Sequence, residues 1–215
     1  MNIKHKFIND ILQPWDELNE LLSKQFCVEP GLSTFTKIAT DIATSISHFA
    51  ETSRIETREI VGQSCLSNQI MIDIADMSKH GKLRKIDREN TINVLSTFEY
   101  IEPSKFKFLR NKIIIEHNTH GKHDFMKTSL NAILYWTTKL GILVKRELMI
   151  ESNVESEKAT LIFNPNFCIH AEKTTYNFQK RNLSGELVDF DPPRFYIEIL
   201  DLEGKVKAYA DVELK

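Results

Sequence analysis

Three histidines lie within one seven-residue stretch of this chain, and this spacing is the feature most able to support chemistry. Imidazole groups titrate near neutral pH and bind transition metals, so such a stretch can serve acid/base chemistry or hold a metal. Three imidazoles and one carboxylate could complete a tetrahedral zinc shell. The predicted ligands of zinc or another divalent metal are His117, His120, His123 and Asp124. The alternative is a polar surface turn, because Gly121 and its neighbours favour a loop and no cysteine pair supports a zinc spacing.

A second constellation lies on a predicted helix. Asp73, Asp76 and His80 stand at positions i, i+3 and i+7, so they share one helix face, and an aspartate there could orient the imidazole as a general base. The alternative is a capped helix end with solvated charges, where basic side chains suit the negative end of the dipole. Residues 75–80 resemble the Ala-(Asn/Asp)-x-x-Lys-His segment of a broad set of uncharacterised bacterial proteins, in which helices precede a small sheet. This resemblance, which extends loosely over residues 70–136, implies a fold and no activity.

The third constellation combines an arginine, an amide and a histidine. Arg110, Asn111 and His117 resemble the Arg-x(4–6)-His signature of HEPN ribonucleases, which are common in prokaryotic toxin and phage-defence systems. The resemblance implies metal-independent RNA cleavage, in which His117 moves the proton of the ribose 2′-OH, Arg110 holds the scissile phosphate and Asn111 supports them. HEPN domains are helical bundles, whereas the three isoleucines at 113–115 favour a strand. In a strand, Arg110 and His117 point to opposite faces, so they would have to converge through the fold or across a dimer interface.

The overall charge limits any contact with nucleic acid to a local patch. Lys and Arg total 28 and Asp and Glu total 30, which leaves a net charge of −2 at pH 7. One basic cluster could meet phosphates, and RNA is a predicted partner on this ground alone. Its members are Lys79, Lys82, Arg84, Lys85 and Arg88. The alternative is a solvated linker, because Asp87 and Glu89 dilute the cluster.

The composition predicts a cytoplasmic protein. Lys4, Lys6 and Asp10 interrupt the first residues, so no signal peptide is indicated, and no apolar run is long enough to cross a membrane. Three cysteines at wide, unpatterned spacing suit reduced and buried thiols better than disulfides. They are Cys27, Cys65 and Cys168. We expect a bacterial protein that makes no membrane contact, and the oligomeric state is left open.

Apolar spacing predicts helices in the first 90 residues. Pro14 favours the first position of a helix over 14–22, because its missing amide hydrogen costs nothing there. Apolar residues recur at steps of three and four between Ser33 and Phe49, which predicts an amphipathic helix. A further helix is predicted over 60–80, and Gly81 can end it by taking the left-handed conformation.

From Thr91 the pattern changes to strands. Residues 91–101 and 106–115 are rich in β-branched and aromatic residues and predict an antiparallel hairpin. Asp124 is a predicted N-cap of a helix that ends at Gly141. Further strands are predicted at 159–163, 174–178, 194–201 and 205–214, the last two as a hairpin. The predicted fold class is α+β, with a helical part (1–90) packed with a mainly antiparallel sheet part (91–215) in one compact unit.

The sequence carries three functional hypotheses in a definite order. It contains no phosphate-binding loop, dinucleotide fingerprint or nucleophile elbow, which argues against nucleotide hydrolysis and serine esterase chemistry. We therefore expect first a non-catalytic interaction or accessory protein of a bacterial defence or toxin-type system, with another protein as partner and no cofactor. The second hypothesis is a metal-independent ribonuclease that uses Arg110 and His117. The third is a metal-dependent hydrolase that uses the 117–124 histidine cluster.

Overall fold

The chain forms an α+β fold whose elements belong to two compact units, interleaved along the sequence. The computed structural model describes residues 2–23, 32–102, 105–147, 155–156, 159–162, 175–191, 194–200 and 206–213. The first unit comprises Met1–Leu21, Ser33–Asn93 and Ile113–Leu148. The second unit comprises Leu22–Leu32, Val94–Lys112 and Met149–Lys215. The predicted α+β class is confirmed, with helices toward the N-terminus and mostly antiparallel strands toward the C-terminus.

The N-terminal helix begins before Pro14, whereas the sequence predicts a start at that residue. Helix α1 (Ile3–Phe7) continues through a π-helical turn (Ile8–Leu12) into helix α2 (Gln13–Leu22). Proline cannot donate a backbone hydrogen bond to the carbonyl four residues earlier. The wider π turn ends at Leu12, two residues before Pro14, so the irregular turn lies next to the missing donor.

Helix α3 (Leu32–Ser53) supplies much of the apolar interior of the first unit. The predicted periodic face is confirmed, because Ile42, Ile46 and Phe49 on it are buried. The Phe49 ring lies between two others, at 5.1 Å from Phe7 and 5.0 Å from Trp136 (centroid to centroid). Aromatic contacts of this kind add to the burial of apolar surface and join α1, α3 and α6.

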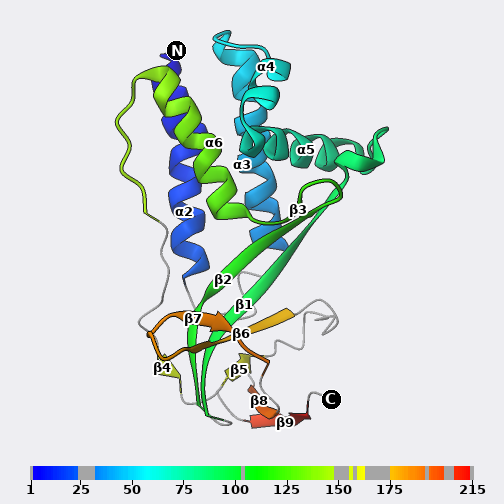
Figure 1. The fold of residues 1–215 in the computed structure, drawn as a ribbon, viewed down its shortest axis with the longest axis vertical. Coiled ribbons are helices and arrows are strands. Elements are labelled where there is room, and N and C mark those ends of the chain that lie inside the picture. Colours follow the sequence, from blue (N-terminus) through cyan, green and yellow to red (C-terminus); the bar gives the residue numbers. More distant parts are fainter. Residues whose placement is uncertain are drawn as a thin grey trace. The chain divides into compact units, whose positions relative to one another are not determined.

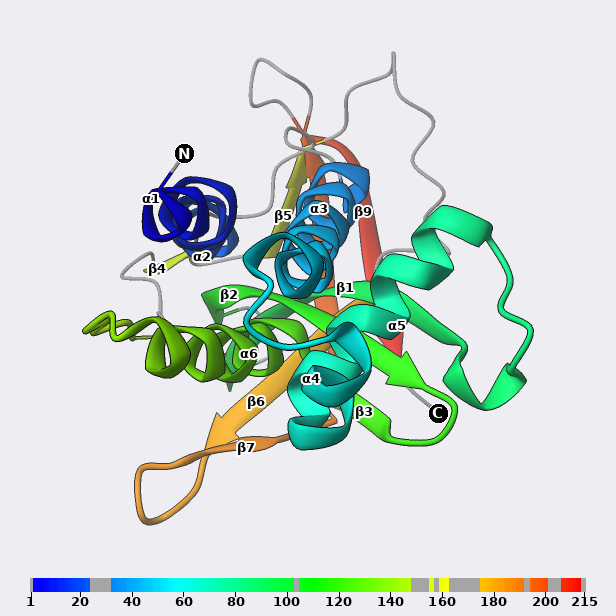
Figure 2. The same ribbon diagram turned by 90° about the horizontal axis from the view of Figure 1, so that it is seen from above.

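The predicted single helix over 60–80 is wrong, because the chain forms two helices there. They are α4 (Arg58–Ser64) and α5 (Leu66–His80), separated by Cys65 in an extended conformation. The break lets α4 pack against α5 so closely that a Cβ atom added at Gly62 would lie 2.4 Å from Gln69 Oε1. Helix α5 runs across α3 rather than along it (Figure 1, Figure 2). It ends as predicted at Gly81, which adopts a φ of 67°.

Cys65 at this break is half-buried, not fully buried as expected. Cys27 and Cys168 lie outside the described residues. Among the helices of the described residues, none has the length and apolar character needed to cross a membrane.

The larger sheet confirms the predicted hairpin and extends it. Its order is β3-β2-β1-β6-β7, and β4 also pairs with β2. The strands are β1 (Asn90–Glu102), β2 (Lys105–His117), β3 (Gly121–Asp124), β4 (Glu155–Ser156), β6 (Thr175–Arg181) and β7 (Leu187–Asp189). Strands β1 and β6 pair in parallel, while β2 with β3 and β6 with β7 pair antiparallel. In the second unit, the Phe98 ring contacts Phe108 and Phe178, with centroids 5.6 and 6.2 Å away.

A second, three-stranded sheet has the order β5-β8-β9. Its strands are β5 (Ala159–Ile162), β8 (Arg194–Leu200) and β9 (Val206–Glu213). The predicted C-terminal hairpin is confirmed, because β8 and β9 pair antiparallel from Arg194 with Glu213 to Leu200 with Val206. Strand β5 adds to β8 in parallel. The predicted strand ends at 163, 174, 201, 205 and 214 lie outside the described residues.

Helix α6 (Phe125–Leu140) follows β3 and has the predicted caps. Asp124 accepts a hydrogen bond from the Lys127 amide at 3.0 Å, and Gly141 adopts a φ of 60°. Buried Trp15 donates its indole N–H to Ser129 on α6 at 2.9 Å, which fixes α2 against α6. Helix α5 and the β2–β3 turn, both in the first unit, carry the aspartates and histidines that could take part in chemistry.

Candidate functional site

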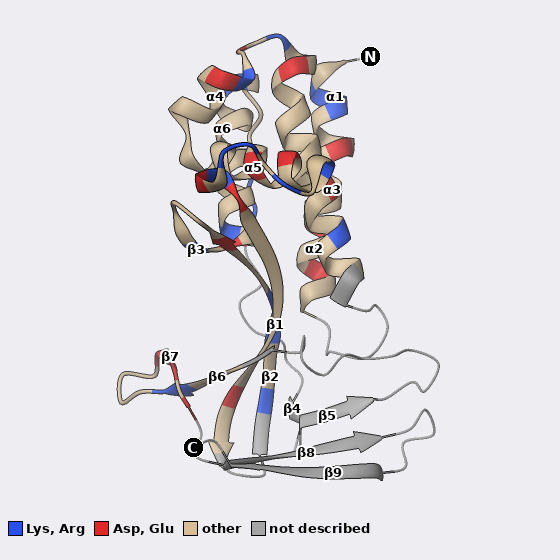
Figure 3. Cartoon of the chain, turned by 90° about the vertical axis from the view of Figure 1, so that its right-hand side faces the viewer, with Lys and Arg blue, Asp and Glu red and all other residues tan. Residues whose placement is uncertain are grey.

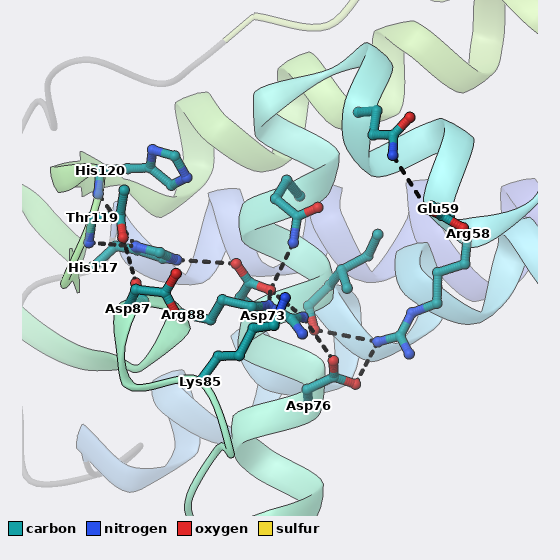
Figure 4. A pocket seen from close by; sticks show the side chains of 13 residues that line it. Arg58, Glu59, Asp73, Asp76, Lys85, Asp87, Arg88, His117, Thr119 and His120 are labelled. Carbon is teal, nitrogen blue, oxygen red and sulfur yellow. Dashed lines mark hydrogen bonds and ion pairs between the residues drawn. The ribbon is translucent and has the colours of Figure 1, made fainter.

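A pocket of about 580 Å³ lies in the first unit, where four segments converge. Its walls come from α4, α5, the short helical turn Ile86–Arg88 and the turn between β2 and β3. Figure 4 shows a continuous chain of polar contacts that runs from His117 through Asp73 to Arg88, Asp76 and Arg58. We call these contacts the polar network, and its charges set the electrostatic character of the pocket.

The centre of the polar network is a buried pair formed by Asp73 and His117. Asp73 Oδ2 lies 3.1 Å from His117 Nε2, and each side chain is 1% exposed. The other ring nitrogen, Nδ1, accepts hydrogen bonds from the amides of Thr119 (3.2 Å) and His120 (3.3 Å). A nitrogen that accepts from N–H groups carries no hydrogen, so Nε2 must carry the hydrogen and donate it to Asp73. His117 is therefore the neutral Nε2–H tautomer, with both ring nitrogens engaged by the protein.

The second oxygen of Asp73 is also engaged. Asp73 Oδ1 accepts from Gln69 Nε2 at 2.8 Å and from Arg88 Nε at 2.7 Å. Gln69 stands four residues before Asp73 on α5, so the two side chains are neighbours on one helix face. All the strong acceptor positions of this buried carboxylate are thus satisfied within the protein, as a buried charge requires.

Asp76, one turn further along α5, is held between two guanidinium groups. Its Oδ2 lies 2.9 Å from Arg88 Nη2, and its Oδ1 pairs with Arg58 Nη2. Burial alone would raise the pKa of Asp76, but hydrogen bonds and positive charge from Arg58, and then from Arg88, outweigh it and lower the pKa. The Asp76 carboxylate therefore links α4 to the segment before β1.

His120 is the imidazole of this turn that remains exposed. Its ring lies against the His117 ring, with centroids 4.6 Å apart and planes inclined by 38°. Burial lowers the pKa of His120, and the negative charge of Asp73 partly opposes this effect. His120 is thus mostly neutral at pH 7, and its ring lines the pocket.

The geometry gives the predicted metal set no support. His123 Nε2 lies 2.9 Å from the His120 carbonyl oxygen and must donate to it, and His117 has no free nitrogen. Asp124 uses a carboxylate oxygen to cap α6. Among the described residues, no group of three or more His, Cys, Asp or Glu side chains is arranged to hold a metal ion.

The three residues of the ribonuclease-like motif fall in different units. His117 belongs to the first unit, whereas Arg110 and Asn111 belong to the second. Arg110 is 7% exposed, and its Nε donates to the Asn111 carbonyl at 3.2 Å. The Asn111 side chain accepts a hydrogen bond from Ser96 at 2.8 Å, on the neighbouring strand β1. Each member of the motif is therefore engaged by its own surroundings.

The predicted helix-face site is only partly assembled. Asp76 lines the pocket, but His80 is exposed at the C-terminal end of α5 and is not among the lining residues. Asp73 does orient an imidazole, as the spacing suggested, but the imidazole is that of His117. The sequence held a signal for this, because Asp73 interrupts the otherwise apolar run 70–75, and a buried charge needs a partner.

Two residues of the network carried no signal for this role in the sequence. Arg58 precedes the helix predicted at 60–80, and Gln69 has no distinguishing motif around it. The role of Arg58 depends on the fold-back of α4 onto α5 at Cys65, which brings its side chain to Asp76.

A separate polar cluster joins the connection between α3 and α4 to α6. Glu56 Oε1 lies 2.6 Å from Lys139 Nζ, and Glu56 also accepts the hydroxyl hydrogen of Tyr135. Burial, followed by the hydrogen bond to Glu56, raises the pKa of Tyr135 to about 12. Hydrogen bonds from Lys139 and then Tyr135 lower the pKa of Glu56. Tyr135 is therefore a protonated donor and not an activated nucleophile.

Comparison of the chain with models of protein families, with curated proteins and with solved structures gives no match. The function is therefore argued from the geometry of the pocket and from the chemistry of its residues.

Proposed function

We propose that this chain acts by binding and not by catalysis, as an interaction or accessory protein. The observation that supports this proposal is the environment of His117. A general base must reach the proton that it removes, either directly or through one water. His117 is 4% exposed as a residue, its Nε2 donates to Asp73, and its Nδ1 accepts from two backbone amides. Its ring has no free lone pair with which to take a proton from a substrate.

The charges around His117 have a structural use. Asp73 and Asp76 are each bound by Arg88, so α5 is tied to the segment that precedes β1. His117 ties the same helix to the β2–β3 turn. Because buried ionic networks fix the geometry of the groups that form them, this arrangement holds the surface around the pocket in one shape. A fixed surface lowers the entropy cost of binding a partner.

The biological setting of the protein is predicted from the sequence alone. The bacterial defence or toxin-type role, the cytoplasmic location and a protein partner remain predictions from composition and from the two resemblances. A gene neighbourhood of housekeeping enzymes would argue against the defence setting.

The two catalytic hypotheses make demands that can be tested. A ribonuclease using Arg110 and His117 requires His117 Nδ1 to leave the amides of Thr119 and His120 and take up a substrate proton. A metal hydrolase requires His117 Nδ1 to leave the amides of Thr119 and His120, and the side chains of His120, His123 and Asp124 to turn with it toward a common ion.

The experiment is an RNA cleavage assay in EDTA and, separately, with zinc or manganese. The parent is compared with Arg110→Ala and with His117→Gln, since glutamine can still donate to Asp73 but cannot transfer a proton. We expect intact RNA from all three proteins under every condition. Cleavage by the parent that is lost in folded His117→Gln would contradict the proposal.

A further inference from the structure

A run of basic residues extends from the last turn of α5 to the start of β1. We call it the basic segment, and its positive side chains are Lys79, Lys82, Arg84, Lys85 and Arg88. The connection is blue along much of its length in Figure 3. Asp87 is the only acidic residue between positions 79 and 88, whereas the whole chain carries a net charge of −2. The segment is thus a local positive feature on a nearly neutral chain.

The backbone of the basic segment is fixed, unlike that of a solvated linker. Leu83 is 8% exposed and anchors its middle. The carbonyl of Ile86 accepts from the Asn118 side chain at 2.7 Å, and that of Asp87 accepts from the Thr119 hydroxyl at 2.6 Å. These bonds tie the segment to the β2–β3 turn. Positive side chains presented from a fixed backbone lose less entropy when they bind than those of a flexible chain.

Four of the positive groups are available to a partner. Lys79, Lys82, Arg84 and Lys85 are exposed. Within the part of the chain that the structure describes, none of these four forms an ion pair, in contrast to Arg88, which is bound to Asp73 and Asp76. Arg88 therefore anchors the segment while the other four face solvent.

The basic segment borders the pocket. Lys85 and Arg88 line it together with the exposed ring of His120. A volume of about 580 Å³ falls within the range that small ligands occupy, roughly 300–1,000 Å³. Histidine rings can stack against an unpaired base, and phosphates along the same strand can meet lysines and arginines. An acidic polypeptide would use the charges but would leave the ring and the pocket without a role.

We propose that the basic segment and the adjoining pocket bind single-stranded nucleic acid, with phosphates on Lys82, Arg84 and Lys85 and a base against His120. This inference rests on the proposed binding role and names nucleic acid, in addition to the protein partner predicted from the sequence, as what the first unit binds. A single strand is required because a base inside a duplex cannot turn into a pocket without unpairing. The low overall charge is compatible with such a site, because the contact is confined to one segment.

The test is the fluorescence anisotropy of a short, labelled single-stranded RNA titrated with the full chain at several salt concentrations. The variant is Lys82→Gln/Arg84→Gln/Lys85→Gln. The matched control is Lys37→Gln/Lys127→Gln/Lys145→Gln, which removes the same charge from exposed lysines of the same unit. We expect the variant to bind at least about tenfold more weakly and the control to bind within about twofold of the parent.

The salt dependence of binding tests the phosphate contacts, and a His120 variant tests the contact with the base. Three phosphate contacts to a single strand give a slope of log K against log salt of about −2, and the variant should lose most of that slope. His120→Ala should weaken binding about tenfold with the slope unchanged, because stacking is not ionic.

Several results would overturn the inference. These are no binding by the parent, equal losses in variant and control, equal affinity for a duplex of the same sequence, and equal affinity for polyglutamate. The RNA is recovered after each titration and examined for cleavage. Intact but unbound RNA refutes this inference and leaves the non-catalytic role standing, whereas bound and cleaved RNA refutes the non-catalytic role and leaves the binding site standing.

Discussion

His117 Nε2 lies 3.1 Å from Asp73 Oδ2, and both side chains are 1% exposed. The two residues are 44 positions apart in the sequence, so their contact joins the middle of α5 to the end of β2. The histidine that the sequence marks as the strongest candidate for chemistry is thus buried by the fold as a donor to a carboxylate. The same contact positions the turn that carries His120.

Removal of either partner should destabilise the first unit. Asp73→Ala leaves the buried His117 N–H without its acceptor and leaves Arg88 with Asp76 alone, which should lower the free energy of unfolding by about 2 kcal/mol. Urea denaturation of Asp73→Ala, His117→Ala and the double variant measures the effect. The double variant should cost less than the sum of the single variants. The control is Asp41→Ala on the exposed face of α3, which should change stability by less than about 0.5 kcal/mol. If the loss of stability in the double variant equals the sum of the losses in the two single variants, the coupling between Asp73 and His117 is refuted.

Stability should fall in acid through Asp76. The pKa of Asp76 is lower in the folded chain than its ordinary value of 3.8. A carboxyl group with a depressed folded pKa contributes its full stability above the unfolded pKa and loses it as the pH falls through the folded pKa. Asp76→Asn should therefore be less stable than the parent at pH 7, and the difference should shrink below about pH 4. Denaturation across this pH range measures it, and a difference that stays constant with pH would show that the carboxylate charge does not contribute.

Gly62 permits the close approach of α4 to α5. A Cβ at this position would lie 2.4 Å from Gln69 Oε1, so Gly62→Ala should displace the Gln69 side chain from Asp73. The lost hydrogen bond costs about 1 kcal/mol, and the better helix propensity of alanine returns about the same. We therefore expect little net change in stability for Gly62→Ala alone.

The diagnostic result for Gly62 is a coupling. Gln69→Ala should cost about 1 kcal/mol in the parent and much less in the Gly62→Ala background. Equal costs in both backgrounds would mean that the alanine methyl group does not reach Gln69.

Tyr135 should ionise at unusually high pH. Its pKa is about 12, because the ring hydroxyl is partly buried and donates to Glu56. The phenolate absorbance of the parent minus that of Tyr135→Phe isolates this group from the other tyrosines. We expect the transition near pH 12 in the parent and a transition closer to the ordinary value of 10.0 in Glu56→Gln. An ordinary transition in both proteins would rule out the Glu56 contact.

Local elements were predictable because their signals are local. The apolar face of α3, the Asp124 cap of α6 and the hairpin of β8 with β9 each depend on neighbouring residues, and all three are confirmed. The break at Cys65 was missed because the packing of α4 on α5 that accompanies it is a tertiary contact.

The candidate site was predictable only in part. The sequence indicated Asp73, Asp76 and His117 as groups of interest but could not join them, since the pairing of α5 with β2 is a tertiary contact. The exposed cations of the basic segment were visible in the sequence. Their fixed backbone was not, because it depends on hydrogen bonds from Asn118 and Thr119 on a distant turn.

The central claim is that His117 is held by the protein and is not free to transfer protons or bind metal. Long-range proton–nitrogen correlation spectra of nitrogen-15-labelled protein test it directly, with the His117 signals assigned by their loss in His117→Gln. At pH 7 we expect a neutral ring with hydrogen on Nε2 and none on Nδ1, unchanged by EDTA or by added zinc. A ring with hydrogen on Nδ1, or one whose nitrogen signals shift on addition of zinc, would contradict the account.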